Sequence, residues 1–540
     1  MTQAEKKQTV LDSAHVGDIK GALGTIRMHD TGSRDTWRAR LRTLLAVLGP
    51  GLIVMVGDND AGAFSTYAEV GQNYGTSLLW TLLLLIPVLY VNQEMALRLG
   101  CVTGVGHGRL ILDRFGKFWG AFSVIDLFLL NALTIVTEFI GITLALGYLG
   151  LPKELGVVAA ALLIMLSAST GSFRKFERMA LILCVGSLVL IPIYFIINPP
   201  IGQIVHDTLV PQLPHGAKLN EVIMLIIAVV GTTVAPWQLF FQQSYVIDKR
   251  LTPRFIPYER VDLWIGIGIV VVGAIAMIAF TAHAFAGHPE FGNFVDAGAV
   301  AAGLEKYYGR LPGVLFAIAL LDASIIGAMA ISLSTAYAIG DVLSLNHSLH
   351  RKPSEAKEFY FVYCGLIIIA AALVVIPGMP LGLLTNAVQA LAGVLLPSAT
   401  VFLLLLCNDK AVLGPWVNSR GVNIFTGIVL AVLVILSVIL TAAVLWPDMN
   451  ERTLITMIAV CGALAVAGGV AAWFMRAPRE KAIEDVSIRD EWRMPPLYEL
   501  PPMQMTSATK LWMGVLRAYL VVAGGMVLYH IVRLAFSHAG

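Results

Sequence analysis

The sequence predicts an all-α polytopic membrane protein in which two five-helix units form an inverted repeat. Three features support this fold class: an apolar composition, a long series of apolar segments, and polar interruptions in the first and sixth of those segments. Hydrophobic residues make up 57% of the 540 residues and charged residues only 13%, whereas soluble domains carry about 25% charged residues. The composition therefore excludes a soluble globular protein.

Apolar segments recur along the chain at the length that a bilayer requires, which is about 20 residues for one helix. We expect thirteen membrane spans, at residues 44–71, 77–97, 119–148, 154–171, 177–198, 219–247, 261–285, 312–341, 358–377, 381–407, 423–446, 453–475 and 511–536. The chain then divides into an N-terminal tail (1–43), a first five-helix repeat (44–200), a second, inverted repeat (217–407), spans eleven and twelve (421–476), a polar linker (477–510) and a final span (511–540). Two or three spans thus follow the repeats.

Basic residues indicate the orientation in the membrane. Arg34, Arg38, Arg40 and Arg42 precede the first span, and other Lys and Arg residues collect in alternate connections. Because Lys and Arg favour the cytoplasmic side, we expect a cytoplasmic N-terminus and linker, in a plasma (inner) membrane. The net charge of +2 gives no reason to expect a nucleic acid partner. The five scattered cysteines do not have the spacing of a disulfide or zinc framework.

The first interruption is the stretch VMVGDNDAGAFSTY, residues 54–67, inside the first span. It places Asp58 and Asp60 at bilayer depth, where each acid costs at least about 2.5–3.5 kcal/mol. Each glycine costs about 1 kcal/mol more in a helix than alanine does. We therefore expect a broken helix at this point.

The sixth span is interrupted in the corresponding place, at Gly231, Thr232, Thr233 and Pro236. A proline inside a helix removes a backbone donor and costs about 3 kcal/mol. Spans one and six are equivalent if spans 1–5 and 6–10 are repeats, and an odd number of spans per repeat inverts the second unit. Paired breaks of this kind indicate the substrate site of a transporter, because unwound backbone at membrane depth must line a cavity or be buried in protein.

The charge of the expected substrate follows from the side chains at the breaks. Both fixed charges there are negative, and no Lys or Arg lies in either stretch. Carbonyl groups freed at the end of each first half-helix add further acceptors. The site therefore suits a cation, most simply a hard divalent ion with oxygen ligands.

Several segments resemble the natural resistance-associated macrophage protein (Nramp) family of divalent metal transporters. These are LGPGLIVMVGDNDAGAFSTYAEVG, ALRLGCVTG, APWQLFFQQS and VLFAIALLDASIIGAMAISLSTAYAIGDVL, and the similarity runs from about Leu44 to Cys407. The resemblance implies two inverted five-helix repeats that hold the ion between the unwound parts of spans one and six.

The family motif Asp-Pro-Gly-Asn in span one corresponds here to Asp60, Ala61, Gly62 and Ala63. The aspartate ligand is therefore kept, whereas an alanine replaces the asparagine ligand. The family motif Met-Pro-His in span six corresponds to Ala235, Pro236 and Trp237. The methionine ligand is therefore absent, and we expect Trp237 to have a packing role.

The resemblance implies further ligands around these motifs. Two backbone carbonyl ligands, each three residues before a motif, would belong to Gly57 and Thr232, and a glutamine ligand in span ten matches Gln389. Asp58 has no counterpart in the family motif but is a further candidate. The set contains only oxygen ligands once the methionine is lost, and Ala63 leaves space beside Asp60.

These departures favour magnesium. A thioether is a soft ligand that selects transition metals, and its loss removes that preference. Mg²⁺ keeps several of its waters and touches one or two carboxylates, which suits a roomy oxygen site. The pattern is similar to the Nramp-related magnesium transporter branch, so we predict Mg²⁺ import by alternating access, with Mn²⁺ carried as well.

Proton coupling is a separate property. The family's proton route uses acids in span three and histidines in span six. Glu138 keeps one of these acids and is expected in the vestibule. The two other acidic positions fall on Phe128 and Ile135, and the two histidine positions fall on Trp237 and Gln242. We therefore predict uncoupled transport. The membrane potential gives a divalent ion about 4.6 kcal/mol per 100 mV, which corresponds to roughly a thousandfold accumulation.

Simpler roles and other functions remain open. Asp60 could serve only as a helix N-cap, Thr232 could bond to its own helix, and Gln389 could join two helices. Asp126 and Asp322 are further intramembrane acids that could pair with a neighbour.

The alternative function is a proton-coupled Mn²⁺/Fe²⁺ Nramp transporter, and a more distant alternative is an amino-acid or organic-solute symporter of the same fold. We expect no enzyme activity and no cofactor. The expected partners are the transported ion and the lipid bilayer, with a monomer as the simplest oligomeric state.

Overall fold

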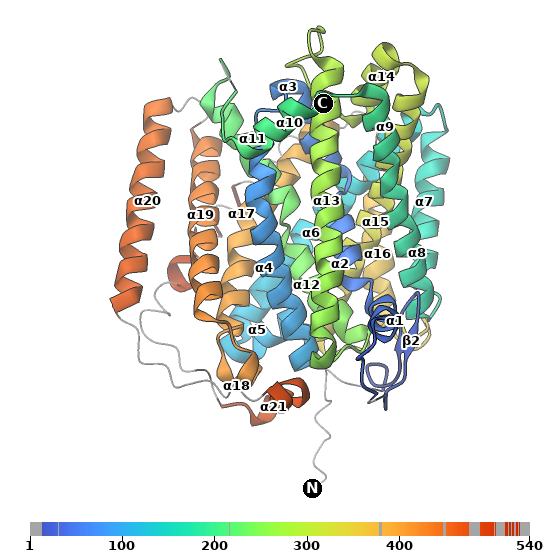
Figure 1. Ribbon diagram of the computed structural model, residues 1–540, viewed down its shortest axis with the longest axis vertical. Coiled ribbons are helices and arrows are strands. Elements are labelled where there is room, and N and C mark those ends of the chain that lie inside the picture. Colours follow the sequence, from blue (N-terminus) through green and yellow to red (C-terminus); the bar gives the residue numbers. More distant parts are fainter. Residues whose placement is uncertain are drawn as a thin grey trace.

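The structure is a computed structural model, and nearly all of its ordered elements are helices (Figure 1). It describes residues 13–30, 32–214, 216–376, 381–446, 450–474 and 486–501, together with single residues and short segments between 503 and 529. Most of the expected final span, 511–536, lies outside the described residues.

The first repeat comprises the helices from α1 to α9. Their bounds are α1 Trp37–Val47, α2 Pro50–Val56, α3 Ala61–Tyr74, α4 Trp80–Thr103, α5 His107–Phe115, α6 Lys117–Tyr148, α7 Lys153–Ala168, α8 Phe173–Gly186 and α9 Leu190–Ile197. A 3₁₀ turn, η1 (Ser187–Val189), joins α8 to α9. The helices from α2 to α9 occupy the five expected spans, and the short α5 lies in the connection between the second and third.

The chain from Ile201 to Leu406 contains α10 and then the helices of the second repeat, α11 to α17. Their bounds are α10 Ile201–Leu209, α11 Leu219–Thr233, α12 Pro236–Asp248, α13 Ile256–Phe285, α14 Ala297–Tyr308, α15 Arg310–Leu343, α16 Lys357–Val374 and α17 Leu381–Leu406. The helices α10 and α14 are short elements in the connections, and both lie at the upper end of the molecule in Figure 1.

The remaining elements follow or precede the repeats. After α17 come α18 Lys410–Leu413, α19 Arg420–Leu445, α20 Glu451–Phe474 and α21 Val486–Glu491. The helix α19 packs on α17 and α20 packs on α19, at one side of the bundle (Figure 1). Before α1, a two-stranded antiparallel hairpin, β1 Ile19–Lys20 and β2 Thr25–Ile26, lies at the same end as α21.

The helices confirm a membrane protein. Among the described residues, ten helices are long and apolar enough to cross a membrane, or eleven if α1 and α2, bent by 52° relative to each other, form one span. The helix α7 has only 16 residues, fewer than the about 20 that a straight span requires. The first helix also begins earlier than expected, at Trp37, and bends before Pro50.

The broken helices lie in the interior of the bundle. The half-helices α2 and α3 both pack against α13, and α12 packs against α4 and α15. The helix α6 packs against α15, while α11 packs against α17. The two breaks are therefore enclosed by α4, α6, α15 and α17, which supply the side chains of the site.

Candidate functional site

The first helix is broken between Val56, where α2 ends, and Ala61, where α3 begins. Asp60 is the N-cap of α3, and its Oδ1 accepts a hydrogen bond from the backbone N–H of Ala63 at 2.9 Å. An N-cap aspartate satisfies a donor that the first turn of a helix leaves free. Both aspartates of the break are buried, with Asp58 0% and Asp60 3% exposed. The predicted break is confirmed, and Asp60 does act as a cap.

The second break lies between Thr233, where α11 ends, and Pro236, where α12 begins. Ala235 is the N-cap of α12 and provides no side-chain hydrogen bond. Because proline has no N–H, the helix can begin at Pro236 without losing a donor. This break also falls where the sequence predicts it.

Hydrogen bonds join the two breaks directly. The Gln238 side-chain amide in α12 donates to Oδ1 of Asp58, and Gln93 in α4 donates to Oε1 of Gln238 at 2.9 Å. On the other half-helices, the hydroxyls of Tyr67 in α3 and Thr233 in α11 are 2.7 Å apart. The breaks therefore form one site.

Both predicted carbonyl ligands have lost their helical donors. In an α-helix the carbonyl of a residue accepts from the N–H four residues later. The partner for Thr232 would be Pro236, which has no N–H. The partner for Gly57 would be Ala61, but the Ala61 N–H donates instead to Oε2 of Glu138 at 3.1 Å. The two carbonyls are thus available for other partners.

Glu138 reaches the first break from α6. Its side chain is 0% exposed, and its second oxygen, Oε1, has no hydrogen-bond partner. Gly327 in α15 allows this approach, because a β-carbon there would lie 2.8 Å from Oε2 of Glu138 and 3.0 Å from Cβ of Asp60. Glu138 therefore stands beside Asp60, nearer to the site than a vestibule residue would be.

Gln389 in α17 lies between the two breaks. A β-carbon at Gly62 would lie only 1.6 Å from Nε2 of Gln389, and one at Gly231 would lie 2.4 Å from its backbone oxygen. The side chain thus covers the first break, while the backbone covers the second. The structure thus brings Gln389 beside both breaks, and its role as a ligand stays a prediction.

Trp237 fills space at the breaks. It is 1% exposed, and its Cη2 would lie 3.6 Å from a β-carbon at Gly57. Its ring also contacts Phe241, with centroids 6.0 Å apart. The alanines Ala63 and Ala235 are buried at 0% and 6% exposure and place no polar side-chain atom at the break.

Buried polar atoms without a hydrogen-bond partner gather around the breaks. They are Oδ2 of Asp58, Oδ1 of Asn59, Oε1 of Glu138, Oγ1 of Thr232, Nε1 of Trp237, both amide atoms of Gln242 and Nε2 of Gln389. Native structures leave few such atoms unpaired, so their concentration here indicates a place for a polar ligand. Within the described part of the chain, no group of three or more His, Cys, Asp or Glu residues forms a metal cluster.

The half-helix α2 is held at its other end by charges. Oδ2 of Asp262 in α13 accepts from the backbone N–H of Gly49, Gly51 and Leu52 at 3.1, 2.7 and 3.3 Å. Nearby, Nζ of Lys249 is 2.6 Å from Oε1 of Glu177, and both side chains are 0% exposed. These groups fix the start of the broken helix.

Sequence reasoning did not identify Gln93, Gln238 or Asp262 as parts of this arrangement. Gln93 is a polar residue inside the apolar segment 77–97 and could have been noticed for that reason. The role of Asp262 depends on contacts across more than two hundred residues, which no local pattern indicates.

The chain resembles a known protein family along most of its length. The model of the family described as natural resistance-associated macrophage protein-like matches residues 51–443. A divalent metal cation transporter MntH from Ralstonia nicotianae is 31% identical over 398 residues, which cover 70% of this chain and 86% of that protein. The protein of the same name from Deinococcus radiodurans is 28% identical over 73% of this chain and 89% of its own length.

A solved structure shares the fold. It is the crystal structure of the Eremococcus coleocola manganese transporter in complex with an aromatic bis-isothiourea substituted compound, with a TM-score of 0.62 and 20% sequence identity. The match covers 84% of this chain and 97% of that one. From the extent of the family match and the identity to its relatives, the chain belongs to the natural resistance-associated macrophage protein-like family.

Proposed function

We propose that the protein carries a divalent metal cation across the membrane by alternating access, with the ion bound between the two helix breaks. The observation that supports this most strongly is the meeting of the breaks around Asp60, with the carbonyls of Gly57 and Thr232 freed from their helices. Hard divalent cations bind carboxylate, carbonyl and amide oxygens. The similar proteins described as divalent metal cation transporters support the same function.

We propose Mn²⁺ as the first substrate to test. The comparisons give no support to the predicted magnesium preference or to uncoupled transport, and they lie closer to the alternative, a proton-coupled Mn²⁺/Fe²⁺ transporter. Mg²⁺ is a second candidate, because Ala63 and Ala235 provide no soft ligand.

In this proposal Asp60 binds the ion directly, while Asp58, Gln389 and the two carbonyls complete the oxygen set or hold its waters. Pro236, Gly62 and the two alanines shape the space, and Glu138 supplies a second carboxyl group beside Asp60. We further propose residence in a plasma membrane and a monomeric state. No enzymatic step and no resident cofactor are part of the proposal.

The experiment is uptake into proteoliposomes that contain fluorescent reporters for Mn²⁺ and Mg²⁺. Asp60→Asn keeps an N-cap residue but removes the charge, so uptake should be lost while the folded fraction is unchanged. Asp296→Asn is the matched control, because Asp296 caps α14 through the same bond, to the Ala299 N–H at 2.8 Å, in the connection between α13 and α15. The proposal is wrong if wild-type protein carries neither ion, or if Asp60→Asn carries it as wild type does.

A further inference from the structure

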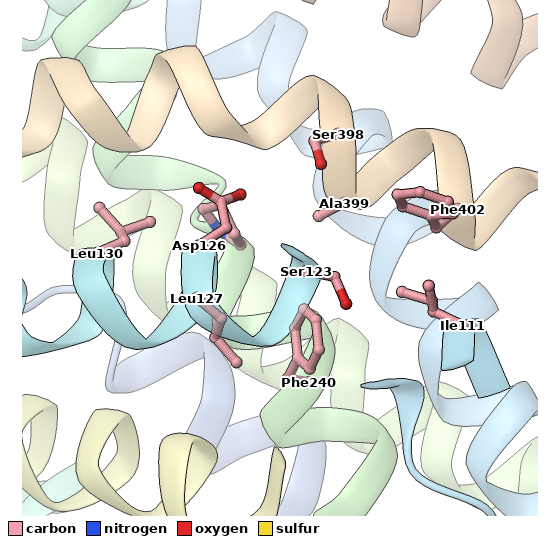
Figure 2. A pocket seen from close by; sticks show the side chains of 10 residues that line it. Ile111, Ser123, Asp126, Leu127, Leu130, Phe240, Ser398, Ala399 and Phe402 are labelled. Atoms are coloured by element: carbon pink, nitrogen blue, oxygen red, sulfur yellow. The ribbon is translucent and has the colours of Figure 1, made fainter. Parts of the chain in front are cut away.

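A small cavity lies on one side of the second break, between α6, α12 and α17 (Figure 2). Asp126 of α6 and Ser398 of α17 both belong to its wall. Its volume of about 10 Å³ matches the space of a single water molecule. This cavity therefore has no room for a ligand larger than water.

The helix α1 carries an exposed apolar stripe at the lower end of the bundle, where the hairpin and α21 also lie (Figure 1). The stripe consists of Trp37, Leu41 and Leu45, which are 69%, 38% and 36% exposed. Residues four apart lie nearly one above the other on a helix, so the three side chains share a sector about 80° wide. A contiguous apolar surface of this kind marks a place of interaction with another protein or with a membrane.

The other side of α1 is already covered by the protein itself. Thr43, Ala46 and Val47 are buried, and α1 packs against α13 and against the hairpin strands β1 and β2. The hairpin comes so close that a β-carbon at Gly21 would lie 2.0 Å from the carbonyl oxygen of Ala46. The apolar stripe therefore faces away from these contacts.

Arginines border the stripe on both sides. The helix contains Arg38, Arg40 and Arg42 and no acidic residue, and all three arginines are exposed. The helical repeat places Arg38 and Arg42 at one edge of the stripe and Arg40 at the other. Arg34, just before the helix, pairs with Asp30 at 3.2 Å. In the part of the chain that the structure describes, the three arginines of α1 have no such carboxylate partner.

The direction of α1 also departs from that of the first span. Only Leu48 and Gly49 separate α1 from α2, yet the two helices are bent by 52° relative to each other. Gly49 has a φ of 150° at this bend, which a glycine adopts without the strain of a side chain. The bend turns α1 away from the axis of the span and toward the plane of the membrane surface.

This pattern fits the surface of a membrane that contains anionic lipids. An interfacial helix buries a face with Trp and Leu at the boundary of the acyl chains, while its basic residues reach the phosphate groups. Basic residues predict that this end of the protein is cytoplasmic, and the cytoplasmic leaflet is the anionic one. The neighbouring helix α13 crosses the membrane and exposes Val261, Trp264 and Ile265 early in its length. Lipid therefore lies close to α1.

We propose that α1 lies in the headgroup region of the cytoplasmic leaflet and binds anionic phospholipids. Trp37, Leu41 and Leu45 lie among the upper parts of the acyl chains, and the three arginines of the helix bind the phosphate groups. Lipid binds here whichever ion the protein carries, so the inference goes beyond the proposed function. The site is joined directly to α2, the inner half of the broken first helix.

The first test is native mass spectrometry of the full chain in detergent with equal amounts of phosphatidylglycerol and phosphatidylcholine. Wild-type protein should retain phosphatidylglycerol in excess. Arg38→Gln/Arg42→Gln should bind it about fivefold more weakly for each arginine removed, whereas Arg38→Lys/Arg42→Lys keeps both charges and should bind as wild type does. Lys117→Gln/Lys357→Gln is the matched control, because it removes two exposed basic residues at the starts of α6 and α16. This control should also bind as wild type does.

The second test addresses the apolar stripe in liposomes. Phospholipids brominated near the headgroup end of their acyl chains quench tryptophans at that depth, so less intensity should be lost in Trp37→Phe than in wild type. Trp416→Phe removes a buried tryptophan and should leave the loss unchanged.

Equal retention of phosphatidylglycerol by wild type and Arg38→Gln/Arg42→Gln would overturn this inference. Equal loss of intensity in wild type and Trp37→Phe would overturn it as well. Neither readout involves metal transport, so a negative result would leave the proposed function unaffected. Failure of wild-type protein to carry any divalent ion would instead overturn the proposed function and not the lipid site.

Discussion

Gln238 of α12 donates a hydrogen bond to the carboxylate of Asp58, and this contact joins the two broken helices across 180 residues of sequence. Gln93 in turn donates to Gln238, so the carboxylate is oriented by a chain of two amides. The second oxygen of Asp58 has no partner. This free oxygen of Asp58 is therefore available to an ion or to a water bound to the ion.

The Asp58–Gln238 contact leads to a first prediction. Gln238→Leu leaves the buried carboxylate without its donor, a loss worth about 1–3 kcal/mol. Because about 1.4 kcal/mol corresponds to a tenfold change in a binding constant, we expect the apparent KM for Mn²⁺ uptake to rise about tenfold or more. Gln72→Leu is the control, since its amide donates to the carbonyl of Glu290 in an outer connection, at 2.9 Å. Equal KM values for both variants would show that Asp58 needs no such orientation.

A second prediction concerns the choice of metal. Ala235→Met restores a thioether at the N-cap of α12, and a soft ligand favours Mn²⁺ over Mg²⁺. The ratio of Mn²⁺ to Mg²⁺ uptake should therefore rise. Ala235→Leu has a similar size without sulfur, and it should not raise the ratio. If both variants give the same ratio, the selectivity is set elsewhere.

The sequence alone could predict the breaks because glycine, proline and acids are conspicuous in apolar segments. The family motifs indicate Asp60 and Gln389 at the breaks and Glu138 in a vestibule, and the structure brings all three to the first break. Their roles in binding the ion stay predictions. The closeness of Glu138 to Asp60 was not foreseen, because it depends on the missing side chain of Gly327 in another helix.

Other contacts lie beyond what periodicity or motifs indicate. The pairing of Gln93 with Gln238 joins residues that are 145 positions apart. Each glutamine is conspicuous in its own apolar segment, but no local pattern indicates that the two meet. Asp262, which caps the start of α2, is more than two hundred positions away from the residues that it contacts. Such contacts are decided by how the helices pack, which local composition does not determine.

The ion pair of Lys249 and Glu177 leads to a third prediction. Both side chains are fully buried, so Lys249→Met leaves an uncompensated charge and should destabilise the protein by about 3–5 kcal/mol. Lys218→Met is the matched control, because Lys218 pairs with Glu221 at 2.9 Å while 81% exposed, and exposed pairs contribute little. Thermal unfolding in detergent should show a lower Tm for Lys249→Met alone. Equal Tm values would contradict a structural role for the buried pair.

The connection between α15 and α16 leads to a fourth prediction, on pH. Burial lowers the pKa of the His347 imidazole, but the Asp341 carboxylate at 3.0 Å outweighs burial and raises this pKa from 6.5 to about 9. A raised pKa means that the folded protein holds the proton more tightly than the unfolded chain. The stabilisation is therefore complete below pH 6.5 and is lost as the pH rises through about 9.

Thermal unfolding of wild type and His347→Gln across this range measures the effect. The Tm of the wild-type protein should fall between pH 6.5 and about 9. The Tm of His347→Gln should fall less over the same interval. Parallel curves for the two proteins would mean that the ion pair does not contribute.

The central claim is that a divalent ion binds between the two breaks at Asp60. The most direct measurement is the anomalous scattering of Mn²⁺ in crystals of the wild-type protein and of Asp60→Asn. The account predicts a peak beside the Asp60 carboxylate and the carbonyls of Gly57 and Thr232, which disappears in Asp60→Asn. A Mn²⁺ peak elsewhere in the bundle with none at the breaks, or one that persists unchanged in Asp60→Asn, would contradict it.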